Sequence, residues 1–334
     1  MRNPNESTSN KKNKNYHKLA SHLTYILFGA TICTFGHGQQ IYAIERPHGI
    51  AIDSTGNIYT SESGNSVEKL DSNGQVLTSW GVKGDGEGEF NDPHGVAIDG
   101  SGNIYVVDTA NFRVQKFSPD GSFVFSIGSE GRNDGQFIHP HAVAVDDSEN
   151  VYVGDFLIPK IQKFDSNGNF ITKWGTEGQG PSQFRVEREG EGIGPEGIDT
   201  DKSGNVYIAD PGNARVQKFD NDGNFIMMWG SNGTGKGHFI YPSGLTVDPS
   251  GNIFVSDEVN KNIQKFDSNG NFIMMWGSPE IFGHVHYIAT DPAGNVFVTD
   301  LENGNIQKFG NNGNALAEFR AEEVDEPQGE EGED

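Results

Sequence analysis

The amino-acid sequence predicts an all-β protein, a six-bladed β-propeller of four-stranded antiparallel blades. Three observations lead to this prediction: a repeat of about 47 residues, four short alternating segments in each repeat, and Gly-containing turns between these segments. A four-stranded unit of this length cannot bury both of its faces alone, so six copies are expected to close into a ring that supplies the core. The chain has 334 residues, and its 45 Gly suit the many tight turns of such a ring.

The repeat is visible at two independent anchors. The first anchor is an Asp that closes an apolar segment, with spacings of 46, 47, 55, 47 and 43 residues between copies. The second anchor is a large apolar residue, with spacings of 47, 47, 55, 47 and 43. The one long spacing reflects an insertion, Val186–Gly194, before the fourth unit. The Asp anchors are Asp53, Asp99, Asp146, Asp201, Asp248 and Asp291, and the apolar anchors are Leu70, Phe117, Phe164, Phe219, Phe266 and Phe309.

Each repeat contains four segments that alternate as half-buried strands do. In the second copy they are Val96–Asp99, Ile104–Val107, Val114–Phe117 and Phe123–Ile127. The last two strands of every copy are joined by Asn-Gly or Asp-Gly, as at Asp120-Gly121. These dipeptides tolerate the positive φ values that a two-residue hairpin turn requires. The pattern therefore predicts a meander of four antiparallel strands.

The four tryptophans occupy one place in the repeat, just before the Gly that follows the fourth strand. Ile127 and Phe319 occupy the same place in the other two copies. A large side chain that recurs there is expected to pack between neighbouring units and not to form a ligand cage. The tryptophans are Trp80, Trp174, Trp229 and Trp276.

The composition excludes several classes of protein. A single Cys rules out an intramolecular disulfide framework and a multi-Cys zinc site. The formal net charge is −23, and residues 39–319 hold 18 Lys and Arg against 38 Asp and Glu. Such an acidic chain lacks the basic face that nucleic-acid binding needs, so no nucleic acid is expected as a partner.

The two ends of the chain differ from the repeats. Residues 1–38 run from a basic segment through an apolar stretch, residues 23–35, to Gly36 and Gly38, which is the layout of a secretory signal peptide. The alternative is an uncleaved N-terminal membrane anchor. We expect a propeller at 39–319, with Gln40–Ile44 as a further strand beside the last blade, and a disordered acidic tail at 320–334. The protein would then be secreted, or anchored and facing outside.

The second repeat closely resembles the NHL repeat. The resemblance rests on Pro-His-Gly-Val-Ala-Ile-Asp at 93–99, Gly-Asn-Ile-Tyr-Val-Val-Asp at 102–108 and Asn-Phe-Arg-Val-Gln-Lys-Phe at 111–117, and it extends over residues 46–319. It implies a six-bladed propeller, which is a shared scaffold. Relatives of this kind include secreted or membrane-tethered sensor domains, the RNA- or protein-binding propellers of tripartite-motif proteins and the peptidyl-hydroxyglycine amidating lyases.

One set of residues could carry chemistry at the mouth of the channel. The first strand of a blade is innermost, so the residues two places before its opening hydrophobe should converge. These residues are His48, His94, His141, Glu196, Ser243 and His286, and His139 and His284 stand two places before two of them. Neutral imidazoles with a carboxylate suit a divalent metal ion, zinc or calcium, for which we predict the ligands His48, His94, His141, Glu196 and His286. The alternative is that duplication of one Pro-His-Gly placed the histidines, each bonding a backbone carbonyl.

The resemblance to the amidating lyases tests the enzymatic alternative. In those enzymes the zinc histidines lie in the same Pro-His context in alternating blades, but the alternating sets here are His94, Glu196, His286 and His48, His141, Ser243. The positions that match the family's catalytic Arg and Tyr hold Glu62, Ala110 and Leu157. The sequence also lacks Gly-x-Ser-x-Gly, His-Glu-x-x-His and phosphate-loop motifs. No catalytic residue is therefore assigned.

The second strands end in an acid, as at Asp108 and Asp210, followed by loops with Asn and Arg. We interpret this Asp–Asn–Arg spacing as tying each loop to its neighbour. The leading hypothesis is an exported, non-enzymatic, monomeric propeller that presents its loop-rich face to a protein, peptide or glycan. The alternative is a metal-dependent lyase or hydrolase of the amidating-lyase type that uses the histidine ring.

Overall fold

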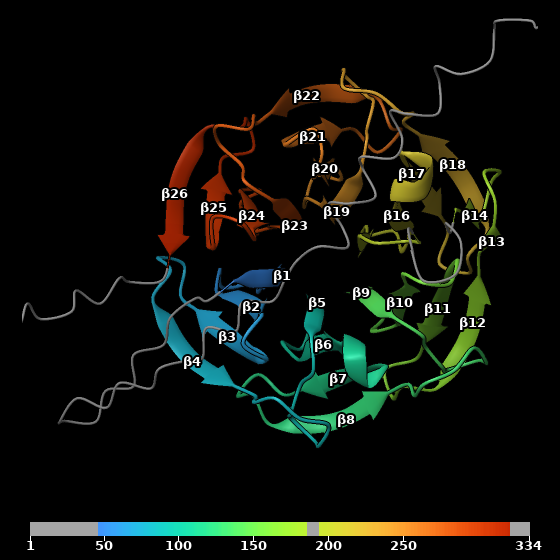
Figure 1. Cartoon of the computed structure of the whole chain (residues 1–334), viewed down its shortest axis with the longest axis vertical. Helices are drawn as coiled ribbons and strands as arrows, with labels where there is room; N and C mark the ends of the chain where they lie inside the picture. Colours follow the sequence, from blue (N-terminus) through green and yellow to red (C-terminus); the bar gives the residue numbers. More distant parts are fainter. Residues whose placement is uncertain (1–45, 186–193, 321–334) are drawn as a thin grey trace, which may run out of the picture. The chain divides into compact units, whose positions relative to one another are not determined.

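A computed structural model describes residues 46–185 and 194–320, and these form six four-stranded antiparallel sheets arranged as blades around a channel (Figure 1). Each blade is made from one contiguous stretch of chain, and its strands pair in chain order from the channel to the rim. The predicted six-bladed β-propeller is confirmed. The predicted signal peptide or anchor at 1–38, the extra strand at Gln40–Ile44, the acidic tail after Arg320 and nearly all of the insertion at 186–194 lie outside the described residues.

The strands of the first three blades are β1 (Pro47–Ile52), β2 (Ile58–Glu62), β3 (Ser66–Leu70), β4 (Val76–Trp80), β5 (Pro93–Ile98), β6 (Ile104–Asp108), β7 (Arg113–Phe117), β8 (Phe123–Ile127), β9 (Pro140–Val145), β10 (Val151–Asp155), β11 (Lys160–Phe164) and β12 (Phe170–Trp174). A short parallel pair, β13 (Thr176–Glu177) and β14 (Gln183–Phe184), follows the third blade. The strands of the last three blades are β15 (Ile198–Thr200), β16 (Val206–Asp210), β17 (Arg215–Phe219), β18 (Phe225–Trp229), β19 (Pro242–Val247), β20 (Ile253–Asp257), β21 (Asn262–Phe266), β22 (Phe272–Trp276), β23 (Val285–Thr290), β24 (Val296–Asp300), β25 (Asn305–Phe309) and β26 (Ala315–Arg320).

Helical structure in the described residues is limited to two single 3₁₀ turns, η1 (Thr109–Asn111) and η2 (Pro211–Asn213). Each ends at a residue with left-handed backbone, Phe112 and Ala214. No helix in the described part of the chain is long and apolar enough to cross a membrane.

The hydrophobic core lies between neighbouring blades. One cluster joins Tyr59 and Val67 of the first blade to Val96 and Ile104 of the second, and the other blade pairs form equivalent clusters. The tryptophans pack across these interfaces as predicted: the ring of Trp80 lies 6.0 Å from that of Phe117 in the next blade. The hairpin residue Gly121 has a φ of +85° and lies against the ring of Trp80. Glycine suits this position because it tolerates a positive φ and has no Cβ that would crowd the tryptophan.

The ring closes between the last blade and the first. Phe319 and Ile306 of the sixth blade form one buried cluster with Ile50, Ile58 and Leu70 of the first. Packing of side chains therefore joins the two ends of the described propeller.

The two faces of the ring differ in their connections. β1 begins beside the end of β2, because Pro47 pairs with Glu62, and the same register recurs in other blades. The blade linkers and the loops between second and third strands therefore share one face with the predicted site residues, which we call the histidine face. The opposite face, the turn face, carries the tight turns that begin at residues such as Asp53 and Asp71.

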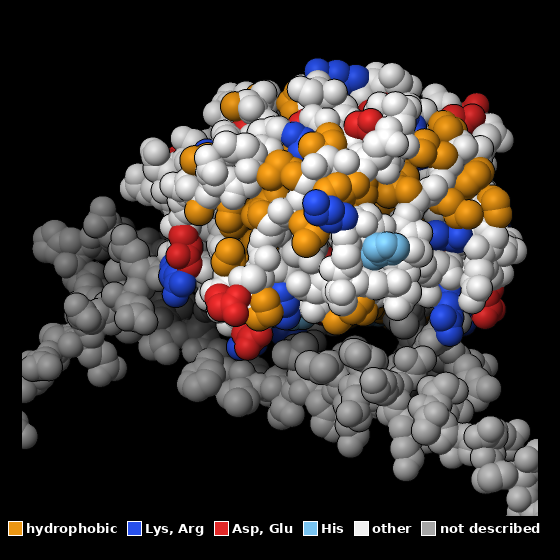
Figure 2. Space-filling model, turned by 90° about the horizontal axis from the view of Figure 1, so that it is seen from above, with side chains coloured by type: hydrophobic (Ala, Val, Ile, Leu, Met, Phe, Trp, Pro, Cys, Tyr) orange, Lys and Arg blue, Asp and Glu red, His pale blue; other side chains and the backbone are white. Residues whose placement is uncertain are grey.

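The rim of the ring is formed by the fourth strands. Figure 2 shows apolar side chains gathered in a band on the rim. Each outer strand exposes an aliphatic residue at its second position, and β18 and β22 add an exposed Met each. These exposed residues are Leu77, Val124, Ile171, Ile226, Met228, Ile273, Met275 and Leu316.

Candidate functional site

A β-bulge at the start of the first strand places the predicted site residues. In the second blade Pro93 pairs with Asp108 but Val96 pairs with Val106, so His94 and Gly95 stand opposite a single residue of β6. The same irregularity occurs in β1, β9, β19 and β23. This bulge explains why β5 begins at Pro93, three residues before the strand that the alternating pattern predicts. Bulges re-aim side chains, and here they accompany the site position in five blades, whereas β15 of the fourth blade pairs with β16 without a register shift.

The histidines converge at the mouth of the channel on the histidine face. The ring centroids of His48 and His94 are 4.7 Å apart, and those of His94 and His141 are 4.1 Å apart. His286 lies 6.0 Å from both His48 and His141. His94, His141 and His286 are 8%, 5% and 5% exposed. The predicted convergence of the four histidines is therefore present in the structure.

Two carboxylates complete the cluster. Glu196 is 2% exposed, and its Oε1 lies 3.2 Å from Nε2 of His286 and 3.8 Å from Nδ1 of His141. Oε1 of Glu258 lies 3.4 Å from the same Nε2 of His286. The other oxygen of Glu258, Oε2, lies 3.2 Å from Nε2 of His284. Ligand atoms of Glu196, Glu258 and His286 all lie within 4.8 Å of one another, a grouping that could hold a metal ion.

Tyr287 crosses the channel beneath this cluster. Its hydroxyl donates a hydrogen bond of 2.8 Å to the backbone carbonyl of His141 in the opposite blade and lies 3.2 Å from Nδ1 of that histidine. The equivalent position in the other five blades holds Gly or Ala, at Gly49, Gly95, Ala142, Gly197 and Gly244. A single tyrosine thus forms a floor below the histidines. We call the space above it the histidine cup, bounded by His48, His94, His141, Glu196, Glu258, His286 and Tyr287.

Hydroxyl groups from second strands hold the backbone of the cup. Ser61 donates to the carbonyl of His94 at 2.5 Å, and Ser256 donates to the carbonyl of His286 at 2.5 Å. Thr299 donates to the carbonyl of His48 at 2.9 Å, across the closure of the ring. Each hydroxyl therefore fixes a histidine of the following blade.

Buried aspartates at the ends of the second strands fix the incoming linkers. Asp155 accepts the backbone N–H groups of Ile138 and His139, and Asp300 accepts those of Gly283 and His284. Asp108 pairs with Arg113 at 2.8 Å, and Arg113 also donates to the linker carbonyls of Gly86 and Glu89. This agrees with the structural interpretation of the Asp–Asn–Arg spacing.

Burial changes the acidity of the cup. Burial, with neighbouring histidines, holds the pKa of His48 and of His141 well below the ordinary value, and burial lowers the pKa of His286 to about 3. Burial also raises the pKa of Glu196 to about 7. For His284 burial acts to lower the pKa, but the bond with Glu258 outweighs it and the pKa is raised. Near neutral pH His48, His141 and His286 are therefore neutral, and they lie beside the Glu196 carboxyl group, which can gain or lose a proton.

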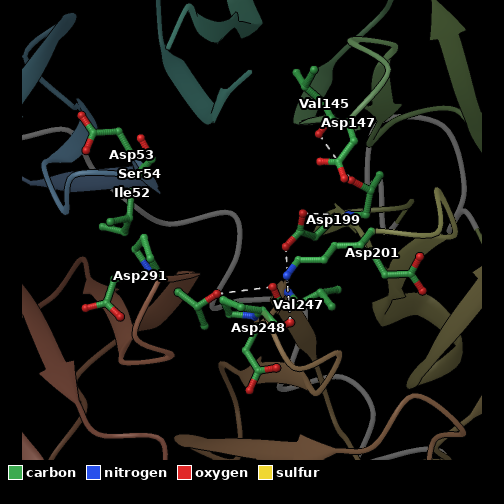
Figure 3. A pocket seen from close by; sticks show the side chains of 15 residues that line it. Ile52, Asp53, Ser54, Val145, Asp147, Asp199, Asp201, Val247, Asp248 and Asp291 are labelled. Carbon is green, nitrogen blue, oxygen red and sulfur yellow. Dashed lines mark hydrogen bonds between the residues drawn. The ribbon is translucent and has the colours of Figure 1, made fainter. Parts of the chain in front are cut away.

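A pocket of about 490 Å³ lies at the opposite, turn-face mouth and contains several aspartates (Figure 3). The side chains of Asp248 and Asp291 turn away from its middle in this view. They accept backbone and Asn side-chain N–H groups of their own turns, as Asp248 does from Asn252 at 2.9 and 2.8 Å. Asp199 accepts the N–H of Val247 at 2.7 Å. These carboxylates are engaged in holding turns and strands together.

Each predicted metal ligand reaches the cup: His48, His94, His141, Glu196 and His286. Metal binding by this set remains a prediction, and the tightest group of ligand atoms contains two of its members with Glu258. Sequence reasoning missed Glu258 because it follows β20 directly and looks like a loop residue. Its backbone N–H bonds the carbonyl of Tyr241, which fixes it beside the strand entry. The available signal was that only the fifth blade has an acid at this position. The other blades hold Ser63, Thr109, Phe156, Pro211 and Leu301.

Comparison with solved structures finds other proteins with a similar fold. The chain resembles a streptogramin B lyase (TM-score 0.59, 15% identity, 83% of each chain covered). It also resembles a chain of a nidogen/laminin complex (TM-score 0.60, 16% identity, 79% of this chain and 93% of that chain) and a gluconolactonase from Xanthomonas campestris (TM-score 0.56, 16% identity, 77% and 85%). At these identities the likeness concerns the fold, a β-propeller.

The family model of the NHL repeat matches residues 90–117, 193–219 and 239–266, in the second, fourth and fifth blades. The protein is therefore a six-bladed β-propeller with NHL repeats in three of its blades, in agreement with the sequence resemblance. A search of curated proteins by sequence finds no match.

Proposed function

We propose that this protein is an exported, non-enzymatic NHL propeller that binds a protein or peptide partner on its histidine face, with the histidine cup as the anchoring point. The observation that carries the proposal is a set of buried ring nitrogens. Nδ1 of His48, His94 and His286 has no hydrogen-bond partner among the described residues. Buried polar atoms in native proteins are almost always paired, so these atoms favour a ligand that supplies the missing contacts.

The architecture around the cup supports a peptide or protein partner. Long blade linkers surround the mouth on this face, and Tyr287 closes the channel below, so a ligand would enter from the linker side and stop at the floor. The similar chain in the nidogen/laminin complex belongs to an assembly of proteins. Export rests on the signal-like order of residues 1–38.

Selection of peptides on the purified protein tests this proposal. Peptides enriched from a random library should bind wild-type protein, and their affinity should fall at least about tenfold in the double variant His48→Ala, His94→Ala, which removes two cup side chains. Asp147→Asn, an exposed change on the turn face, serves as the matched control and should bind as wild type does. Peptides that bind equally well to the cup variant, or a selection that enriches none, would contradict the proposal.

A metal-dependent lyase or hydrolase is the second candidate function. The favouring observation is Glu196, whose pKa is raised by burial to about 7. A carboxyl group that titrates near neutral pH suits proton transfer. The residues that match the catalytic Arg and Tyr of amidating lyases, Glu62, Ala110 and Leu157, speak against that particular activity. Turnover of a hydroxyglycine peptide or a lactone that is lost in Glu196→Gln would favour the enzyme.

A further inference from the structure

In a group of three ligand atoms in the histidine cup, two of the three distances match the spacing of ligands around one metal ion. Nε2 of His286 lies 3.2 Å from Oε1 of Glu196 and 3.4 Å from Oε1 of Glu258. Ligand bonds of 2.0–2.2 Å at tetrahedral angles put neighbouring ligand atoms roughly 3.3–3.6 Å apart. Both distances therefore fit a shared ion, and all three atoms already lie within 4.8 Å of one another.

The charges of this group call for a cation. Two carboxylates face one imidazole nitrogen, and a neutral imidazole has one N–H to donate. The ion pairs of Glu196 and Glu258 within the described residues are with histidines, His141, His284 and His286. A divalent ion would balance the carboxylates of the buried Glu196 and the partly buried Glu258 at once.

The surroundings hold these ligands in place. Oε2 of Glu258 lies 3.2 Å from Nε2 of His284, and the backbone N–H of His284 donates a hydrogen bond to Asp300. The carbonyl of His286 accepts the hydroxyl of Ser256 at 2.5 Å. Metal sites depend on such outer contacts, which orient the ligands and set their protonation. The ligands come from three different blades, the fourth, fifth and sixth, so the fold brings them together before any ion arrives.

We propose that Glu196, Glu258 and His286 bind one divalent transition-metal ion, with zinc as the test ion, and that this ion is the contact through which the cup holds its ligand. This inference rests on the proposed function in assigning the cup as the binding site. Three protein ligands leave a fourth position of a tetrahedral ion open for a partner's side chain or a water. The mixed imidazole and carboxylate set favours zinc-like ions over calcium, which takes 6–8 oxygen ligands.

Competition with a chromogenic chelator measures the site directly. Wild-type protein, stripped of metal and titrated with Zn²⁺, should bind one ion per chain, and excess Ca²⁺ should not displace it. Glu258→Gln keeps the shape of the side chain but removes its charge, and it should weaken zinc binding at least about tenfold, as His286→Gln should. Circular dichroism of each variant should remain that of the wild-type β fold.

Two matched controls separate this site from its neighbours. Glu302→Gln removes an exposed carboxylate from a loop of the sixth blade and should leave zinc affinity unchanged. Asp147→Asn changes an exposed carboxylate on the turn face, outside the cup, and should also retain one zinc ion per chain. Wild-type protein without stoichiometric zinc would overturn the inference, as would unchanged affinity in Glu258→Gln. Loss of zinc in Asp147→Asn together with retention in Glu258→Gln would also overturn it.

The selected peptides distinguish this inference from the proposed function. Peptide binding should fall when a chelator removes the metal and return when Zn²⁺ is restored. Peptides that bind the cup equally well with and without metal would overturn the metal inference alone. Zinc bound with the predicted variant pattern, but with no peptide bound, would support the ion and contradict the proposed scaffold function.

Discussion

The functional groups of the cup come largely from single residues that depart from the repeat. The first, second, third and sixth blades carry a histidine at the start of the first strand, whereas the fourth carries Glu196. The sixth blade also replaces a small residue by Tyr287, whose hydroxyl reaches the opposite blade. Glu258 adds an acid where the other blades have none. The chemistry therefore lies where copies of the repeat have diverged, while the shared positions maintain the ring.

A testable prediction concerns the single residue His284, which positions Glu258. Its Nε2 lies 3.2 Å from Oε2 of Glu258, so His284→Ala should release that carboxylate and weaken zinc binding about tenfold or more. His284→Gln can still donate a hydrogen bond and should restore part of the affinity. Chelator competition gives the affinities, and urea unfolding gives the stability of each variant. Equal affinities in wild type and His284→Ala would show that this contact does not orient Glu258.

The convergence of the histidines could be predicted from their equal positions in the repeat, because equivalent residues of a ring meet at one mouth. Glu258 could not be found in the same way. Its place depends on a backbone bond to Tyr241 and on the bulge of a neighbouring strand, which alternation of polar and apolar residues does not reveal. The floor formed by Tyr287 likewise depends on a contact between residues 146 positions apart.

Within each blade, the turns and bulges decide what the strands present at either face. The turn after the first strand is built on an aspartate that accepts N–H groups from residues two and four positions later, as Asp248 does from Ser250 and Asn252. Burial alone would raise the pKa of Asp248, but the bonds from Asn252 and other neighbours outweigh it and the pKa is lowered. These aspartates therefore stabilise the fold in their charged form.

The lowered pKa of Asp248 leads to a prediction about how stability depends on pH. A depressed pKa means that the charged Asp248 stabilises the folded state above the pKa of the unfolded chain, near 3.9, and that this stability is lost as the pH falls through the folded-state pKa. Asp248→Asn should cost about 1 kcal/mol or more at pH 7, and the gap to wild type should narrow on acidification to about pH 3. Urea unfolding at both pH values measures the gap. A gap of the same size at both, or an equal loss in the exposed Asp147→Asn, would contradict this account of the turn.

The strand order and blade number could be predicted because hairpin dipeptides and apolar anchors recur with one period. The start of the first strand could not, since the bulge at residues such as His94 and Gly95 interrupts the alternation there. The expected strand at Val96–Asp99 is observed as β5, Pro93–Ile98. The physical reason is that the pairing of β5 with β6 resumes beyond the extra residue.

At the scale of the whole molecule, the ring depends on the closure of its last blade on its first. Phe319 is 7% exposed and packs with Ile50, Ile58 and Leu70 of the first blade. Thr299 adds a hydrogen bond to the carbonyl of His48 at the same junction. The cup straddles this junction, because His48 and His286 belong to the two blades that meet there. Stability of the closure and geometry of the cup are therefore coupled.

Phe319→Ala tests that coupling. Removal of a buried aromatic ring typically costs about 3–5 kcal/mol, so the variant should unfold at a markedly lower urea concentration. Phe123→Ala, which removes a half-buried aromatic residue of β8 at the interface of the first and second blades, is the comparison for a general packing effect. We expect zinc affinity to fall in Phe319→Ala but not in Phe123→Ala, under conditions where both variants are folded. Equal zinc affinities in the two variants would show that closure of the ring does not influence the geometry of the cup.

In the proposed metal site, three side chains from three blades bind one ion on the histidine face. Anomalous X-ray diffraction from crystals of the protein grown with zinc, measured on both sides of the zinc absorption edge, tests it most directly. The predicted result is one strong anomalous peak per chain, about 2.0–2.2 Å from Nε2 of His286 and from carboxylate oxygens of Glu196 and Glu258. A peak held instead by His48, His94 and His141, a peak at the turn-face pocket, or no peak in the cup would contradict the claim.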